Sequence, residues 1–173
     1  MLSVALKGAY ERAKLEPSKI QDICVGNNLQ TGAGEIPSRM GAFLAGIPDT
    51  TPIVAINRLC SSGLEACGIV ASKIKAGVID VGIGSGVESM SLYDMNDSVN
   101  AEKLSEFVFE NEKSQQCLMG MGITSENVAE KYGISKEKQD EMAVESHQKA
   151  FKAREAGLFK SINLPLYRLN CPN

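Results

Sequence analysis

The sequence predicts an α/β fold in which helices cover a parallel sheet. Short apolar runs alternate in the N-terminal half with segments whose apolar residues recur at helical spacing. The run IVAIN at 53–57 is almost continuously apolar, which is typical of a parallel strand buried on both faces. The chain has 173 residues, enough for one domain with a core of its own.

The predicted elements of this half follow one another without long gaps. Leu2 to Ala13 place their apolar residues on one helical face, and Pro17 breaks that pattern. A glycine-rich loop at 30–37 precedes a short helix, whose start suits Pro37 and which ends near Gly46. The predicted strands are 22–27, 53–57 and 80–89, and the predicted third helix is 60–76.

The pattern changes after residue 91. Residues 94–116 are polar and charged without a clear period, which predicts a loop or a loosely ordered insertion. Helical spacing returns at 124–132. Ser135 is a suitable N-cap for a long helix to about residue 156, with Glu137 in its first turn and Gly157 as its stop.

Composition excludes several kinds of function. Net charge is −3 without a long basic run, which disfavours nucleic acid or an anionic membrane as partner, and no apolar stretch is long enough to span a bilayer. The five cysteines form no CxxC pair and the chain has one histidine, so no zinc site is predicted. Scattered cysteines of odd number indicate free thiols in a reducing compartment. We interpret residues 1–15 as an ordinary first helix rather than a targeting segment.

Cys60 lies where the strand at 53–57 gives way to a helix. Backbone N–H groups without partners and the positive end of the helix dipole meet there. Both favour thiolate over thiol and can stabilise the oxyanion that forms when a thiolate attacks a carbonyl. The alternative is that Cys60 is a small buried apolar residue, as free cysteines often are, and this is our interpretation of Cys67. The small residues 61–63 allow a tight turn.

The glycines of GIGSGVES at 82–89 do not predict a nucleotide site. Their spacing is not G-x-G-x-x-G and no helix opens directly after them. We expect instead that they allow close backbone packing near a strand end.

Four separated segments resemble the thiolase family, in particular its peroxisomal 3-ketoacyl-CoA branch. They are DICVGNNLQTGAGEIPSRMGAFLAGIPDTTP (22–52), NRLCSSGLEA (57–66), GVESMS (86–91) and MGITSENVAEKYGISKEKQDEMAVESHQKA (121–150). The resemblance implies a thiolase-like N-terminal half, a three-layer α-β-α arrangement with a mostly parallel sheet, plus part of the loop domain. It divides the chain into a core at 1–92, loop-domain helices at 93–157 and a divergent tail at 158–173.

Thiolases cleave a 3-ketoacyl-CoA with coenzyme A in fatty-acid β-oxidation, so the resemblance implies an acyltransferase. Cys60 would be the acyl-thioester nucleophile, its backbone N–H serving one oxyanion hole, and Met121 would lie beside the acyl pocket. Gly120 stands where family members more often have Pro or His. Coenzyme A and acyl-CoA are then substrates, with no bound cofactor and no metal. The family further implies the peroxisome, although no targeting signal is visible and the alternative is the cytoplasm, and a homodimer paired through the strand at 53–57.

The family's second half carries an Asn-Glu-Ala-Phe segment, a Gly-His-Pro histidine and a Cys-x-Gly cysteine, which this sequence lacks. His147 is expected to be structural or exposed, and Cys171 to have no catalytic role. We therefore expect a chain truncated at both ends, whose missing first strand leaves a seam between 22–27 and 80–86. The alternative function is an inactive fragment that pairs with a full-length thiolase through 53–57 or binds acyl-CoA weakly.

Overall fold

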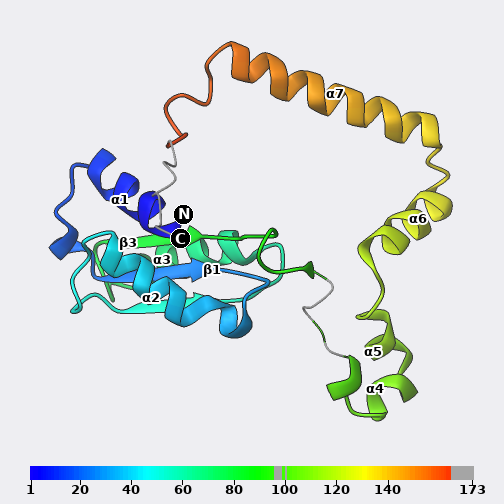
Figure 1. The fold of residues 1–173 in the computed structure, drawn as a ribbon, viewed down its shortest axis with the longest axis horizontal. Helices are drawn as coiled ribbons and strands as arrows, with labels where there is room; N and C mark the ends of the chain where they lie inside the picture. Colours follow the sequence, from blue (N-terminus) through cyan, green and yellow to red (C-terminus); the bar gives the residue numbers. More distant parts are fainter. Residues whose placement is uncertain (96–98, 100, 165–173) are drawn as a thin grey trace, which may run out of the picture. The chain divides into compact units, whose positions relative to one another are not determined.

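The structure, a computed structural model, describes residues 1–95, 99 and 101–164. The chain forms two compact units, Met1–Val99, with which Leu164 groups, and Asn100–Asn163. Figure 1 shows the ribbon with most of the helices and strands labelled.

A three-stranded parallel sheet forms the centre of the first unit. Its strands are β1 (Asp22–Gly26), β2 (Ile53–Ile56) and β3 (Gly82–Gly86), in the order β2-β1-β3. The central strand β1 is buried along its whole length and pairs with both neighbours in parallel. The predicted parallel α/β fold is thus confirmed.

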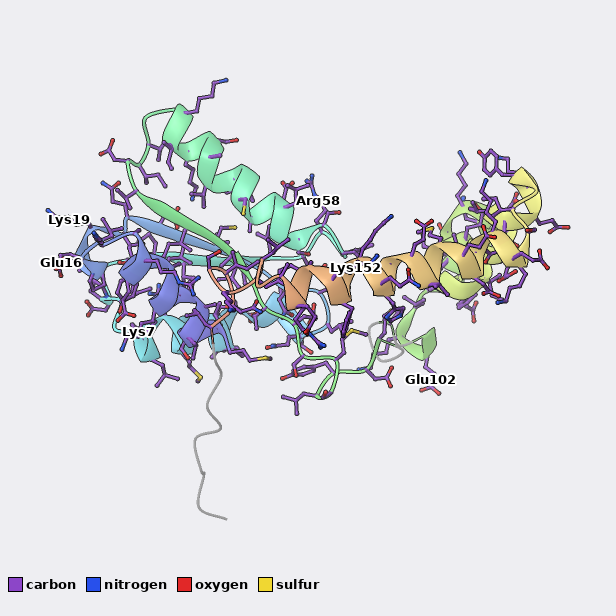
Figure 2. The ribbon with its side chains drawn as sticks, turned by 90° about the horizontal axis from the view of Figure 1, so that it is seen from above. Lys7, Glu16, Lys19, Arg58, Glu102 and Lys152 are labelled. Atoms are coloured by element: carbon purple, nitrogen blue, oxygen red, sulfur yellow. The ribbon has the colours of Figure 1, made fainter. Side chains whose placement is uncertain are left out.

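Helices cover both faces of this sheet. The helices α1 (Leu2–Arg12) and α2 (Glu35–Leu44) lie on one face, and α3 (Ser62–Lys75) lies on the other (Figure 2). Successive side chains of a strand point to opposite faces. Ile23 and Val25 of β1 accordingly pack in the cluster of α1 and α2, whereas Cys24 packs in that of α3. The expected three-layer arrangement is therefore confirmed.

Two expectations about the sheet are wrong. β1 and β3 pair directly, from Asp22 opposite Gly82 to Gly26 opposite Gly86, so there is no open seam between them. β2 is not buried on both faces, because it lies at an edge of the described sheet and Val54 is 39% exposed. The apolar sequence of β2 is therefore that of an edge strand with an uncovered side.

Most helix positions follow the prediction, with shifts at their starts. The short 3-10 helices η1 (Pro17–Lys19) and η2 (Thr31–Gly34) occupy the predicted break and the glycine-rich loop. Pro37 lies in the first turn of α2. The predicted start of the third helix at Cys60 is wrong by two residues, since α3 begins at Ser62.

The second unit is helical. It contains η4 (Ala101–Lys103), α4 (Phe107–Glu110), α5 (Glu112–Gln116), α6 (Met121–Tyr132) and α7 (Lys136–Glu155). The expectation of a loop at 94–116 is therefore wrong for its second half, where short helices form, while residues 96–98 and 100 lie outside the described residues. Residues 165–173, which hold Cys171 and most of the expected divergent tail, also lie outside them.

The long helix α7 confirms its predicted ends. The Ser135 hydroxyl accepts a hydrogen bond from the backbone N–H of Lys138 at 3.4 Å. At the other end Gly157 has a φ of 72°, a left-handed conformation that glycine adopts without steric cost.

Acid should weaken the start of α7 through Glu137. Hydrogen bonds from its own backbone N–H and from Ser135 lower the pKa of this carboxyl. A lowered folded-state pKa gives stability that is present above the unfolded-state pKa and is lost as pH falls through the folded-state pKa. We expect Glu137→Gln to remove this part of the acid-induced loss of helix, measured as circular dichroism during an acid titration. Superimposable titrations of the two proteins would contradict this.

Candidate active site

Cys60 lies in the turn that joins the edge strand β2 to α3. Its side chain is exposed, and Ser61 after it is the N-cap of α3. Cys60 is therefore just before the helix and not in its first turn. Arg58, two residues earlier, lies at this end of α3 and pairs with Glu65 at 2.9 Å (Figure 2).

The backbone immediately before Cys60 is strained. Leu59 has a φ of 50°, in the left-handed region that a branched side chain rarely adopts. Such a conformation costs on the order of 1–3 kcal/mol and persists only where neighbouring interactions hold it. The turn therefore depends on contacts that fix Leu59.

The Ser62 hydroxyl supplies two of these contacts. Its oxygen accepts from the N–H of Arg58 at 2.8 Å, and its O–H donates to the carbonyl oxygen of Leu59 at 2.6 Å. Ser62 is 4% exposed, so water does not replace these bonds readily. One buried hydroxyl thus ties both sides of the strained residue to the start of α3.

The N–H groups of the turn are not all engaged. Those of Arg58, Leu59, Ser61 and Ser62 donate hydrogen bonds. Among the described residues, none of the hydrogen bonds of this turn is donated by the Cys60 N–H. A backbone donor beside an exposed thiol can stabilise the oxyanion that forms when that sulfur attacks a carbonyl carbon.

Glycine lets α3 approach β1 closely beneath this turn. A Cβ on Gly26 would lie 2.5 Å from the carbonyl carbon of Ser62 and 2.7 Å from the nitrogen of Gly63. These are backbone atoms, which cannot turn aside as a side chain can. The end of β1 thereby sets the position of the first residues of α3.

Side chains also tie the turn to the ends of β1 and β3. Asn57 Oδ1 accepts from the N–H of Leu59 at 2.8 Å, and Asn57 Nδ2 donates to the carbonyl oxygen of Asn28 at 2.9 Å. The Glu88 carboxylate accepts from the N–H of Asn28 at 2.9 Å and of Leu29 at 3.3 Å. Because all three strands are parallel, these residues meet at the carboxyl end of the sheet.

The other cysteines differ from one another in exposure. Cys24 is buried, while Cys67 and Cys117 are exposed. The interpretation of Cys67 as a core residue is therefore wrong. The buried stripe of α3 runs through Ser62, Ala66 and Val70, and Cys67 lies beside it over Gly84, which has no side chain to cover it.

Cys24 should be the slowest of the described cysteines to react. Burial raises the pKa of its thiol, with a smaller contribution in the same direction from Asp22. Because the folded-state pKa is raised, the contribution to stability is present below the unfolded-state pKa and is lost as pH rises through the folded-state pKa. We expect Cys24→Ala to flatten the alkaline fall in the free energy of unfolding. Equal alkaline slopes, or early alkylation of Cys24 in the folded chain, would contradict this.

The glycines of β3 serve close packing, as predicted. A Cβ on Gly84 would lie 2.6 Å from the Cα of Cys67, and one on Gly82 would lie 2.9 Å from the side chains of Ile79 and Val70. These glycines therefore bring α3 down onto the sheet.

Met121 and His147 belong to the second unit. Met121 is the first residue of α6 and is 68% exposed, and His147 is exposed on α7. The role expected for Met121 therefore rests on the resemblance alone. The exposure of His147 agrees with the prediction.

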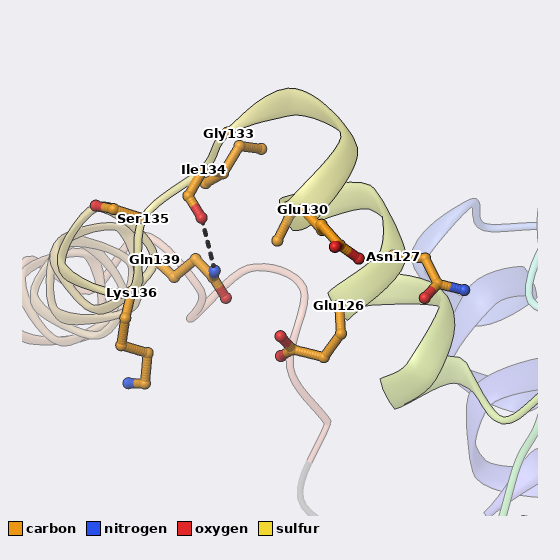
Figure 3. Close-up of a pocket in the computed structure, with 9 residues that line it drawn as sticks. Glu126, Asn127, Glu130, Gly133, Ile134, Ser135, Lys136 and Gln139 are labelled. Atoms are coloured by element: carbon orange, nitrogen blue, oxygen red, sulfur yellow. Dashed lines mark hydrogen bonds between the residues drawn. The ribbon is translucent and has the colours of Figure 1, made fainter.

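A hollow of about 540 Å³ lies at the turn between α6 and α7 (Figure 3). Glu126 and Glu130 of α6 face Gln139 of α7, whose Nε2 donates to the carbonyl oxygen of Ile134 at 3.3 Å. Most of its lining is exposed and it holds no cysteine. We therefore place the candidate active site at Cys60 and not here.

Within the described ranges, no three His, Cys, Asp or Glu side chains gather as metal ligands would. None of the helices described there has the length and apolar character needed to cross a membrane.

The sequence alone does not predict that Asn57, Ser62 and Glu88 support the site. Asn57 had a usable signal, since an Asn side chain often bonds the N–H two residues on, and here it does so. Glu88 had no such local signal, because Asn28, whose N–H it binds, lies 60 residues away in the sequence.

The first unit is a parallel α/β core with an exposed cysteine at a strained strand-to-helix turn, which makes Cys60 a candidate thiol nucleophile. The chain belongs to the thiolase family: the family described as "Thiolase, N-terminal domain" matches residues 1–167.

Curated and solved relatives agree with this. The human peroxisomal 3-ketoacyl-CoA thiolase is 46% identical over 166 residues, 96% of this chain and 38% of that protein. The peroxisomal enzyme of Yarrowia lipolytica is 47% identical over 96% of this chain and 40% of its own length. The chain thus spans well under half of these relatives.

Solved structures show the same fold. The dimeric peroxisomal thiolase of Saccharomyces cerevisiae superposes with a TM-score of 0.85 at 42% identity, over 96% of this chain and 44% of that one. The Acat5 thiolase of Ascaris suum, solved in complex with coenzyme A, gives a TM-score of 0.79 at 27% identity, over 95% of this chain and 45% of that one.

Proposed function

We propose that this chain carries the acyl-accepting half of a thiolase site, with Cys60 as the nucleophile. The observation that carries the proposal is the exposed thiol of Cys60 at a turn whose strained Leu59 is held in place, with the Cys60 N–H free to donate. The 46% identity to a peroxisomal 3-ketoacyl-CoA thiolase supports the reaction class.

The Cys60 thiolate attacks the C3 carbonyl of a 3-ketoacyl-CoA, and the bond between C2 and C3 breaks. The acyl group stays on the sulfur as a thioester, while C2 takes a proton from water and leaves as acetyl-CoA. Splitting the transfer through a covalent intermediate replaces one difficult step by two easier ones. The Cys60 N–H would stabilise the oxyanion that forms during the attack.

Coenzyme A and acyl-CoA are proposed as substrates, with no bound cofactor. The coenzyme A complex of the Ascaris relative supports this chemistry. Met121 is proposed to line the acyl pocket. A peroxisomal location is proposed from relatives whose names include it. A role in fatty-acid β-oxidation is proposed from the reaction of the thiolase family.

A second thiolase chain, identical or full-length, is the proposed protein partner. β2 has one unpaired edge in the described sheet, and Val54 on it is exposed. Such an edge can pair with a strand of another chain. The description of the yeast peroxisomal thiolase as dimeric is consistent with this.

The test is a stoichiometric reaction of the 173-residue chain with acetoacetyl-CoA, in which released acetyl-CoA is measured. We expect up to one acetyl-CoA per chain from the wild type and from Cys67→Ser, and none from Cys60→Ser. Cys67 is the matched control because its thiol is also exposed on the same unit. Equal release from Cys60→Ser and the wild type would overturn the proposal.

A further inference from the structure

The turn that presents Cys60 is anchored from outside itself. Local contacts of Ser62 bind the N–H of Arg58 and the carbonyl of Leu59, but they leave the N–H of Leu59 to another acceptor. Asn57 Oδ1 is that acceptor, at 2.8 Å. Asn57 therefore holds the one N–H that belongs to the strained residue itself.

Asn57 is in turn fixed by the end of β1. Its Nδ2 donates to the carbonyl oxygen of Asn28 at 2.9 Å, which orients the amide so that Oδ1 faces Leu59. An amide held at both ends has one orientation, whereas an amide held at one end can rotate away. The Asn28 peptide thus becomes part of the support of the turn.

Glu88 fixes that peptide from the end of β3. One carboxylate oxygen accepts from the N–H of Asn28 at 2.9 Å, and the other accepts from the N–H of Leu29 at 3.3 Å and Asn27 Nδ2 at 3.4 Å. Asn27 is 2% exposed and also donates to the carbonyl oxygen of Val87 at 2.6 Å. The ends of β1 and β3 are therefore held together by hydrogen bonds that do not involve the Cys60 turn.

From this continuous path we infer that Asn57 and Glu88 are positioning residues for Cys60, acting through the Asn28 peptide to hold Leu59 at its positive φ. The inference rests on the proposed function, since it assigns these residues to the presentation of the acyl-accepting thiol. Neither residue takes part in the bond changes. Their role is to keep the thiol and the Cys60 N–H in the relation that acyl uptake needs.

The consequence is a difference between two reactions of the same sulfur. Alkylation by iodoacetamide needs an exposed thiolate, whereas acyl uptake also needs the oxyanion donor in place. Loss of positioning should slow acyl uptake more than alkylation. Loss of folded protein alone would reduce both in proportion.

The test compares acyl uptake from acetoacetyl-CoA with alkylation of Cys60, both followed by mass spectrometry on the 173-residue chain. We expect Asn57→Ala and Glu88→Ala to lower acyl uptake about threefold to tenfold, the range of one net hydrogen bond, with alkylation changed less than about twofold. Asn57→Asp keeps the acceptor for Leu59 but loses the donor to the Asn28 carbonyl oxygen, so acyl uptake should remain slow. Full recovery of acyl uptake in Asn57→Asp would contradict the path through Asn28. Glu65→Gln is the matched control, because it removes the ion pair of the exposed Arg58 with the partly exposed Glu65 beside the same turn and should change neither rate.

The most decisive comparison is the effect of Asn57→Ala in the wild type and in the Leu59→Gly variant. Glycine adopts a positive φ without strain, so little remains for Asn57 to hold, and Asn57→Ala should cost much less in that background. An equal loss in both backgrounds, or parallel falls of acyl uptake and alkylation, would overturn the inference.

A separate readout keeps this inference distinct from the proposed function. If the wild type takes up no acyl group, the proposed function fails, and the intraresidue HN–Hα NOE of Leu59, which is strong only at positive φ, still tests the positioning. A change of φ to the negative region in Asn57→Ala supports the inference, and a retained positive φ contradicts it.

Discussion

Replacing Gly26 with alanine should destabilise the first unit and displace the Cys60 turn. The new Cβ would lie 2.5 Å from the Ser62 carbonyl carbon and 2.6 Å from its oxygen, so α3 must move away from β1. Overpacking of this kind costs about 1–3 kcal/mol, and contact with backbone places the change toward the upper end. Urea denaturation of the two proteins measures the loss.

Gly68 offers a matched control for this prediction. It lies within α3, and a Cβ there would meet no atom within 4 Å. Gly68→Ala should therefore gain up to about 1 kcal/mol from helix propensity. The account of Gly26 would be contradicted if both alanine variants changed stability in the same direction.

Acyl transfer by this chain should stop after one acyl group. Passing that group to coenzyme A requires a base for the incoming thiol, and general acid–base help is worth roughly a hundredfold to ten-thousandfold. The sequence has one histidine, His147, which is exposed on α7 of the other unit. We expect acetyl-CoA release to rise to one equivalent and then to continue at least about a hundredfold more slowly.

The measurement is a time course at a large excess of acetoacetyl-CoA and coenzyme A. Sustained release at the initial rate, with no full-length thiolase present, would show that a base had been overlooked. His147→Ala would then identify or exclude the histidine.

The sequence allowed the fold to be predicted where local signals agree with tertiary packing. The apolar run at β1 and the caps of α7 are of this kind, because Ser135 and Gly157 act through contacts within a few residues. The edge position of β2 and the exposure of Cys67 were not predictable in this way. Both depend on what covers them, and no local pattern carries that information.

The candidate site shows the same division. Cys60 stood out because the change from strand to helix is visible in the sequence. The positive φ of Leu59 was not predictable from the sequence, because leucine disfavours that conformation. The hydrogen bonds that support it come from residues at the ends of β1 and β3. The start of α3 was placed too early for the same reason, because a supported turn resembles a first helical turn in sequence.

The most direct test of the central claim is to locate the acyl group itself. The chain would be incubated with acetoacetyl-CoA, digested under mildly acidic conditions that preserve thioesters, and its cysteine peptides fragmented in a mass spectrometer. We predict one acetyl group per chain, on Cys60, with unmodified peptides for Cys24, Cys67 and Cys117. An acetyl group on Cys67 or Cys117, or an unmodified Cys60 that iodoacetamide still labels, would contradict the account.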